Sequence, residues 1–183
     1  MKKIYLPLIE TGTIISKILR KYTKHLYNHV SISLRDDLSE MYSFGRLNPY
    51  IFCWGGFVIE HPGKGIYKRF PKTRTKVLEL TVSDQSFDII KNCIDQFIRD
   101  KDSYGYNYRG IFAAKRNKGY QGSYRKFYCS QFVNYLLVCA HVLPEDYFGE
   151  FVRPEDFSSI ENATVVYEGL LTDYTSPVDS DPT

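Results

Sequence analysis

The sequence has little of what a metal site, a membrane span or a nucleic-acid surface requires. Its 183 residues include only four cysteines, two methionines and one tryptophan. The cysteines form no close C-x-x-C pair, so we expect no zinc site. No apolar run is long enough to cross a bilayer, and a net charge of +3 is too small to indicate nucleic acid as the main partner. We therefore expect no metal, no transmembrane segment and no nucleic-acid partner.

The first residues also lack the features of a secretion signal. Met1-Lys2-Lys3 is basic, but the residues that follow include Pro7 and Glu10 and no small-residue cleavage site. A cytoplasmic location is expected, and in a reducing compartment the cysteines should be free thiols. Cys129 and Cys139 are about 15 Å apart along one predicted helix, which is too far for a disulfide bond.

What the chain does contain is the composition of one globular domain, with 43% hydrophobic and 25% charged residues. We predict a single domain over residues 1–171 and a disordered polar tail over residues 172–183. Apolar spacing predicts a helix from about residue 14 to residue 26, a second helix from Ser83 or Asp84 to about Arg99, and strands over residues 4–9, 29–34, 38–44, 57–60, 77–82 and 163–171.

Residues 29–34 alternate strictly between polar and apolar side chains, which places His29 on the face opposite the apolar residues. Residues 38–44 are predicted to return as the second strand of a hairpin. If Leu34 pairs with Leu38 across a three-residue loop, His29 lies opposite Ser43. A change of one residue in the loop would move this pairing.

Cys129 lies at the start of a predicted helix that ends at Pro144. The apolar residues of this helix form one stripe: Phe132, Val133, Leu136, Leu137, Ala140 and Leu143. Unpaired N–H groups and the helix dipole favour a thiolate at this position. The alternative is that Cys129 is a small buried hydrophobic residue.

Residues 103–126 are rich in tyrosine, glycine and basic residues, among them Lys115, Arg116 and Lys118. Such a segment could bind phosphate or a nucleic-acid strand, or it could be a solvated loop. We favour a third interpretation. Because the segment ends just before Cys129, it should form one rim of the cleft there, where its positive charges would select anionic substrates.

A cysteine hydrolase needs an imidazole within hydrogen-bond reach of the thiol. His141 is about 18 Å from Cys129 along the same predicted helix, and His61 lies in a turn before a proline. His25 and His29 have i, i+4 spacing, but the alternating pattern indicates that the helix has already ended, and the H-E-x-x-H arrangement is absent. His29 is the remaining candidate.

The order of these elements resembles the circularly permuted branch of the papain-like NlpC-type cysteine hydrolases, which is related to the lecithin retinol acyltransferase-like proteins. In that branch the histidine precedes the cysteine. The residues that carry the resemblance span nearly the whole domain: Ile14-Ile15-Ser16-Lys17, His29-Val30-Ser31-Ile32, Gly56-Phe57-Val58, Tyr106-Asn107-Tyr108 and Tyr128-Cys129-Ser130-Gln131-Phe132-Val133.

The resemblance implies an α+β, permuted papain-like fold, in which a central antiparallel sheet packs against helices and the nucleophile helix lies in the core. It implies Cys129 as nucleophile and His29 as general base and acid. The position that matches the family's third residue is Ser43, with Glu40 as the alternative. The Cys129 N–H would stabilise the oxyanion. Substrate contacts are expected from Tyr128, Lys115, Arg116 and Lys118.

The implied activity is that of a thiol protease or amidase that needs no metal or organic cofactor. The expected substrate is a small peptide or amide, such as a cell-wall-type peptide, although without an export signal only cytosolic fragments would be within reach. One alternative is a lipid acyltransferase or phospholipase, as in the lecithin retinol acyltransferase-like relatives. Another is a binding module with an idle site, which a serine as third residue would favour. Close contact between the Cys129 sulfur and the His29 ring in an open cleft would favour an enzyme, whereas a sulfur buried under side chains would favour the binding module.

Overall fold

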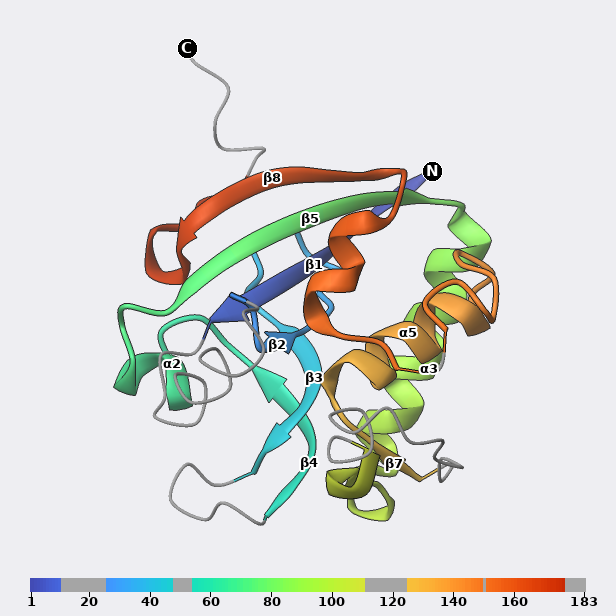
Figure 1. Cartoon of the computed structure of the whole chain (residues 1–183), viewed down its shortest axis with the longest axis horizontal. Coiled ribbons are helices and arrows are strands. Elements are labelled where there is room, and N and C mark those ends of the chain that lie inside the picture. Colours follow the sequence, from blue (N-terminus) through green and yellow to red (C-terminus); the bar gives the residue numbers. More distant parts are fainter. Residues whose placement is uncertain (11–25, 48–53, 111–124, 150, 177–183) are drawn as a thin grey trace.

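The computed structural model describes residues 1–10, 26–47, 54–110, 125–149 and 151–176. Its largest sheet has four strands in the spatial order β2-β1-β5-β8, and all neighbouring pairs are antiparallel (Figure 1). The bounds of these strands are Lys2–Glu10 for β1, His29–Val30 for β2, Arg74–Val82 for β5 and Ala163–Leu170 for β8.

Two smaller strand pairs complete the described sheets. Strands β3 (Met41–Arg46) and β4 (Gly55–Glu60) form an antiparallel hairpin, and β6 (Gly105–Tyr106) and β7 (Lys126–Phe127) form a short parallel pair. Isolated bridges connect residues 32 and 33 to both sides, Ile32 to Tyr42 and Ser33 to Tyr5. The segment that begins with His29 therefore joins the hairpin to the main sheet.

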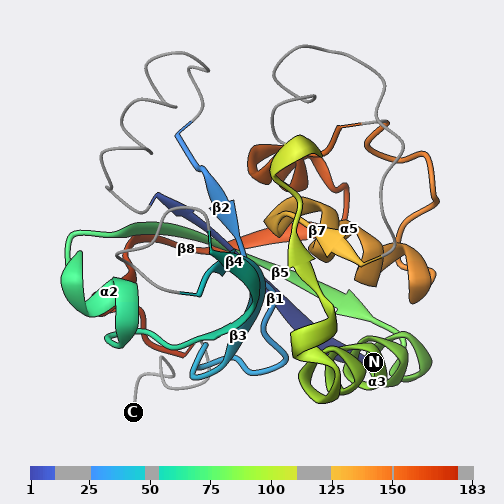
Figure 2. The same cartoon turned by 90° about the horizontal axis from the view of Figure 1, so that it is seen from below.

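The described helices are α2 (Gly65–Arg69), α3 (Asp84–Arg99) and α5 (Cys129–Cys139), with 3-10 turns at Lys101–Ser103, Pro154–Ser159 and Leu171–Asp173. Ser83 caps α3, because its Oγ accepts a hydrogen bond from the Ser86 N–H at 2.9 Å. Helices α3 and α5 pack against each other, and Figures 1 and 2 both place α2 on the opposite side of the molecule from them.

Strand β1 lies at the centre of the core because both of its faces are buried. Leu6 and Leu8 belong to a large apolar cluster shared with α3 and α5. Tyr5 and Ile9 point the other way, into a smaller cluster that includes a residue of α2. This two-sided burial fixes β1 firmly, and β2 inherits its position through the β1 pairing.

Phe44 of β3 is fully buried and connects the β3–β4 hairpin to α5. Its ring centroid lies 5.3 Å from that of Phe132 on α5 and 5.9 Å from that of Phe97 on α3. Tilted and edge-to-face contacts at this spacing add to the energy of burial. The first turn of α5 is therefore packed directly against the hairpin.

The molecule is a mixed α+β protein with a mostly antiparallel sheet, as the α+β part of the sequence interpretation expected. The predictions of strands near residues 4–9, 57–60, 77–82 and 163–171, of the helix capped by Ser83, and of the helix starting at Cys129 are confirmed. Most of the helix predicted from about residue 14 to 26 lies outside the described residues.

The predicted register between residues 29–34 and residues 38–44 was wrong by two residues. Ile32 pairs with Tyr42, so paired positions sum to 74 rather than 72, and the loop is longer than three residues. The cause is the turn itself: Leu38 adopts φ 52° and Asp37 Oδ1 accepts the Ser39 N–H, so Leu38 belongs to the turn and cannot pair with Leu34. A shift of two keeps every side chain on its face but changes its neighbours.

Ordered contacts also extend beyond residue 171, into the segment predicted to be a tail. The Tyr174 hydroxyl donates to the Asp36 carbonyl and the Ser176 hydroxyl to the Asp36 carboxylate, each at 2.7 Å. The rest of the predicted tail, residues 177–183, lies outside the described residues.

Candidate active site

His29 opens β2 and is held by pairing with β1. Ile9 lies opposite His29 and Leu8 opposite Val30 in this register. Val30 is fully buried, so alternation along the strand turns the His29 side chain away from Val30, with 12% of its side chain exposed. The backbone therefore fixes the imidazole in a largely buried position.

Cys129 is the first residue of α5, and the helix start is fixed by hydrogen bonds. Tyr128, the N-cap, has extended backbone angles, and its N–H donates to Oε1 of Gln131 at 3.3 Å. Asn107, which is buried, donates to the same oxygen at 2.9 Å. These contacts set the thiol at the positive end of the helix dipole, where a thiolate is stabilised.

Cys129 and His29, a hundred residues apart in the chain, lie close enough in the structure for each side chain to shift the pKa of the other through hydrogen bonding and charge. Nε2 of His29 contacts the Glu60 carboxylate, so Nδ1 is the ring nitrogen that is left for the thiol. Cys129 is buried, with only 6% of its surface exposed.

The acid beside His29 is Glu60, the last residue of β4, which the sequence interpretation missed as a site residue. Nε2 of His29 lies 3.1 Å from Oε1 and 3.0 Å from Oε2 of Glu60. The two side chains are equally buried, each with 12% of its surface exposed. Cys129, His29 and Glu60 form a continuous chain of thiol, imidazole and carboxylate.

Neither residue expected to orient His29 contacts its ring in the described hydrogen bonds. The Ser43 hydroxyl is buried and donates to the Val30 carbonyl at 2.7 Å, a structural bond between the hairpin and β2. The Glu40 carboxylate is at the surface, where it accepts from the Tyr42 hydroxyl. The register shift explains the difference, because it places Gly45, not Ser43, beside His29: a Cβ on Gly45 would lie 3.8 Å from His29 Cε1.

Burial opposes charge on both His29 and Cys129, but their partners outweigh it. Desolvation lowers the pKa of His29, whereas the Glu60 carboxylate and the Cys129 hydrogen bond raise it, to about 10. Desolvation raises the pKa of the Cys129 thiol, whereas the hydrogen bond and charge of His29 bring it below its usual range. The arrangement therefore favours a thiolate–imidazolium pair near neutral pH.

Three phenols surround this pair. Burial raises the pKa of Tyr67, Tyr106 and Tyr128, and the nearby charge of Cys129 raises each of them further. Each phenol therefore stays protonated and can donate a hydrogen bond. Tyr128, an expected substrate-binding residue, is 5% exposed and so lies beneath the surface of the site.

Gly55, the first residue of β4, is packed tightly against Tyr106 and Tyr108. A Cβ at Gly55 would lie 2.8 Å from the Tyr106 Cβ and 2.9 Å from the Tyr108 hydroxyl oxygen. The Gly55→Ala variant must displace these tyrosines, and we expect a loss of about 1–3 kcal/mol in the free energy of unfolding, measured in urea. Gly105→Ala is the matched control, because its nearest neighbour would be 3.7 Å away. Equal losses in the two variants would contradict this packing.

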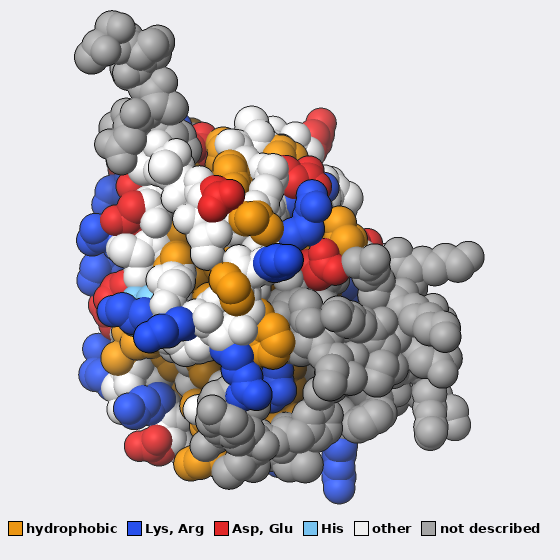
Figure 3. All heavy atoms as spheres, turned by 90° about the vertical axis from the view of Figure 1, so that its left-hand side faces the viewer, with side chains coloured by type: hydrophobic (Ala, Val, Ile, Leu, Met, Phe, Trp, Pro, Cys, Tyr) orange, Lys and Arg blue, Asp and Glu red, His pale blue; other side chains and the backbone are white. Residues whose placement is uncertain are grey.

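The basic rim residues Lys115, Arg116 and Lys118 lie outside the described residues. On the face seen in Figure 3, Lys and Arg side chains are interspersed with acidic and hydrophobic ones rather than gathered in one patch. His25 and Cys53 also lie outside the described residues. His61 is engaged with the Ser39 carbonyl, 2.6 Å from its Nδ1, and Cys93 and Cys139 are free.

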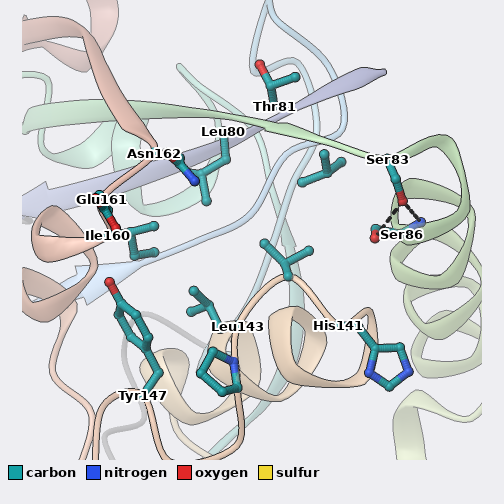
Figure 4. A pocket seen from close by; sticks show the side chains of 13 residues that line it. Leu80, Thr81, Ser83, Ser86, His141, Leu143, Tyr147, Ile160, Glu161 and Asn162 are labelled. Carbon is teal, nitrogen blue, oxygen red and sulfur yellow. Dashed lines mark hydrogen bonds between the residues drawn. The ribbon is translucent and has the colours of Figure 1, made fainter.

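A pocket of about 410 Å³ lies near the other end of α5, lined by residues of β5, the start of α3 and the segment after α5 (Figure 4). His141, just beyond α5, is among its lining residues, and Cys129 is not. Among the residues that the structure describes, no group of three or more His, Cys, Asp or Glu side chains is arranged so that it could hold a metal ion. No helix in the described ranges is long and apolar enough to cross a membrane.

Comparisons with known proteins give no relative for this chain: no family model, no curated protein and no solved structure matches it.

Proposed function

We propose that this protein is a cysteine-dependent amidase or peptidase with a circularly permuted papain-like fold. The observation that carries the proposal is the contact chain from the Cys129 thiol through His29 to the Glu60 carboxylate, with the thiol at a helix N-terminus. A nucleophile, a base and a group that orients the base are what acyl transfer by a thiol requires. His29 precedes Cys129 in the chain, which is the permuted order.

In the proposed reaction the Cys129 thiolate attacks the carbonyl carbon of an amide. The carbonyl oxygen becomes an oxyanion that the Cys129 backbone N–H stabilises, because it is an unpaired donor at the start of α5. The His29 imidazolium donates its proton to the leaving nitrogen, and the C–N bond breaks to give an amine and a thioester.

Neutral His29 then takes a proton from water as the water oxygen attacks the thioester. The C–S bond breaks, the carboxylic acid leaves and the thiolate–imidazolium pair is restored. Glu60 stabilises the imidazolium in the resting pair and fixes the orientation of the ring. No metal or organic cofactor takes part in these steps.

The burial of Cys129 favours a second candidate, a binding module whose site is idle. A thiol with 6% exposure is inert if no substrate can reach it. The other reason for this candidate, a weak third residue, no longer holds, because Glu60 supplies a carboxylate to His29.

A substrate panel tests the proposal. We expect peptide amides to release amine in the presence of the protein and to leave a transient acyl group on Cys129, detected by mass spectrometry after acid quenching. Lipid esters of matched acyl length serve as the comparison. Turnover of the lipid esters alone would instead indicate a phospholipase or acyltransferase. No acyl adduct with either class, together with an unreactive Cys129, would indicate the binding module.

A further inference from the structure

Ser31 lies beside His29 because the two are separated by one residue in extended chain. Side chains at positions i and i+2 of a strand share a face. The Ser31 N–H donates to the Pro7 carbonyl at 3.1 Å, which ties this position to β1. Ser31 is fully buried. A hydroxyl in such a place must form its hydrogen bonds with protein groups.

The partners of Ser31 are the acid and the base of the site. Its Oγ donates to Glu60 Oε2 at 2.5 Å and lies 3.3 Å from His29 Nε2. An ionised carboxylate can only accept, so the hydroxyl hydrogen points to Glu60 and a lone pair of the oxygen faces Nε2–H. A charge-assisted bond of this length is stronger than one between neutral groups.

We propose that Ser31 is a positioning residue that holds the Glu60 carboxylate against His29 Nε2. The inference rests on the proposed function, since it concerns the same acid and base. Glu60 reaches the ring from another strand, and its side chain has rotatable bonds that a single contact does not fix. Ser31, on the same extended segment as His29, supplies a second contact to Glu60. The positions of the Glu60 carboxylate and the His29 ring are therefore both set by this segment.

The other groups around this contact do not replace Ser31. Burial and the Glu60 charge raise the pKa of Tyr67 of α2, but within the described part of the chain its buried hydroxyl has no hydrogen-bond partner. Burial and then the charge of Cys129 raise the pKa of Tyr106 and of Tyr128. Arg46 lowers the pKa of Tyr106, whereas Asp156 raises and Arg153 lowers that of Tyr128. Among the residues that the structure describes, Ser31 is the one whose hydroxyl lies within hydrogen-bond distance of both Glu60 and His29.

The test is the pH dependence of Cys129 alkylation by iodoacetamide, followed by peptide mapping of the full-length protein. Without Ser31 the carboxylate is less well placed, so the imidazolium and then the thiolate lose stabilisation. We expect Ser31→Ala to raise the midpoint of alkylation by about one pH unit, which means about tenfold slower alkylation below the midpoint.

Ser33→Ala is the matched control. Ser33 is equally buried on the same segment, but its hydroxyl donates to the Arg35 carbonyl at 2.9 Å, outside the site. Each variant loses two contacts of one buried hydroxyl, to the Arg35 backbone for Ser33 and to Glu60 and His29 for Ser31, so both should lose stability, whereas only Ser31→Ala should move the midpoint. Equal midpoints in the two variants would overturn the role of Ser31 even if Cys129 stays the reactive thiol. An unreactive Cys129 in the unsubstituted protein would instead overturn the proposed function.

Ser31→Thr keeps the hydroxyl and covers the case in which Ser31→Ala fails to fold. If the alkylation midpoint of Ser31→Thr lies within about 0.3 pH units of that of the unsubstituted protein, the hydroxyl is sufficient and the proposal is supported. A shift of one unit would be a tenfold change in the equilibrium. A folded Ser31→Thr variant whose midpoint rises by a full unit despite its hydroxyl would contradict it.

Discussion

Cys129→Ala is expected to abolish turnover of the amide substrate, with a fall of roughly 10⁴-fold or more, because the reaction loses its nucleophile. Labelling by an iodoacetamide probe at pH 6 should disappear with it. At that pH a thiol with an ordinary pKa is less than about 1% ionised, whereas the His29 partner lowers the pKa of Cys129. Rapid labelling at pH 6 therefore reports this one cysteine.

Cys93→Ala is the control for this result. Burial and the neighbouring Cys139 raise the pKa of Cys93, so it should label slowly at neutral pH and its removal should leave the signal in place. Urea unfolding of both variants checks that the fold is kept, since replacing one small buried side chain by alanine costs on the order of 1 kcal/mol. If labelling persisted at equal intensity in Cys129→Ala, the reactive thiol would be another cysteine.

The sequence contained enough information to single out Cys129 and His29, the proposed nucleophile and base. Cys129 is marked by a helix stripe that begins directly after it, and the burial of Phe132, Val133, Leu136 and Leu137 in the structure follows that stripe. His29 is marked by the polar and apolar alternation of its strand. Both are local patterns, and local patterns are what periodicity can detect.

Glu60 could not be found in the same way because its role depends on a three-dimensional register. In the sequence Glu60 is only an acidic residue at the end of a short strand, and many surface strands end with an acidic residue. The pairings of Ile32 with Tyr42 and of Met41 with Glu60 place the Glu60 backbone level with residue 33, so its side chain reaches His29 diagonally across the strands. The turn at Leu38 sets the first pairing, and its positive φ is not evident from a leucine. The misjudged turn placed Ser43 instead of Gly45 opposite His29, and no register in the sequence pointed to Glu60.

The same register explains why Ser43 is still buried and polar. A two-residue shift left it on the inner face, where its hydroxyl meets the Val30 carbonyl instead of an imidazole. Its hydrogen bond joins the hairpin to the strand of His29. The polarity of Ser43 correctly indicated a buried contact, but the predicted partner, His29, was wrong. The alternation of the strand decides which face a side chain is on, whereas the turn decides which residue lies opposite it.

His29→Ala should produce the second large effect, a loss of thiolate character at Cys129. In the unsubstituted protein the ion pair is present above the lowered pKa of Cys129 and is lost as pH rises through the raised pKa of His29, about 10. Turnover should therefore be bell-shaped, with its alkaline limb near that value. Without His29 the thiol loses the two strongest effects that lower its pKa, and the Val30 backbone, the Ser130 hydroxyl and the helix start oppose burial more weakly, so its pKa should rise.

Alkylation of Cys129 at pH 6 should then slow in His29→Ala, since each unit by which the thiol pKa rises is a factor of ten in the thiolate population. Glu60→Gln removes the charge but keeps the shape, so its midpoint should lie between those of the unsubstituted protein and His29→Ala. Glu79→Gln is the matched control: Glu79 has 13% of its side chain exposed and is paired with Lys3, away from the site. Ser43→Ala should leave the midpoint in place. If Ser43→Ala moved it and Glu60→Gln did not, the acid would be assigned to the wrong strand, and the contact chain from thiol to carboxylate would no longer explain the reactivity of Cys129.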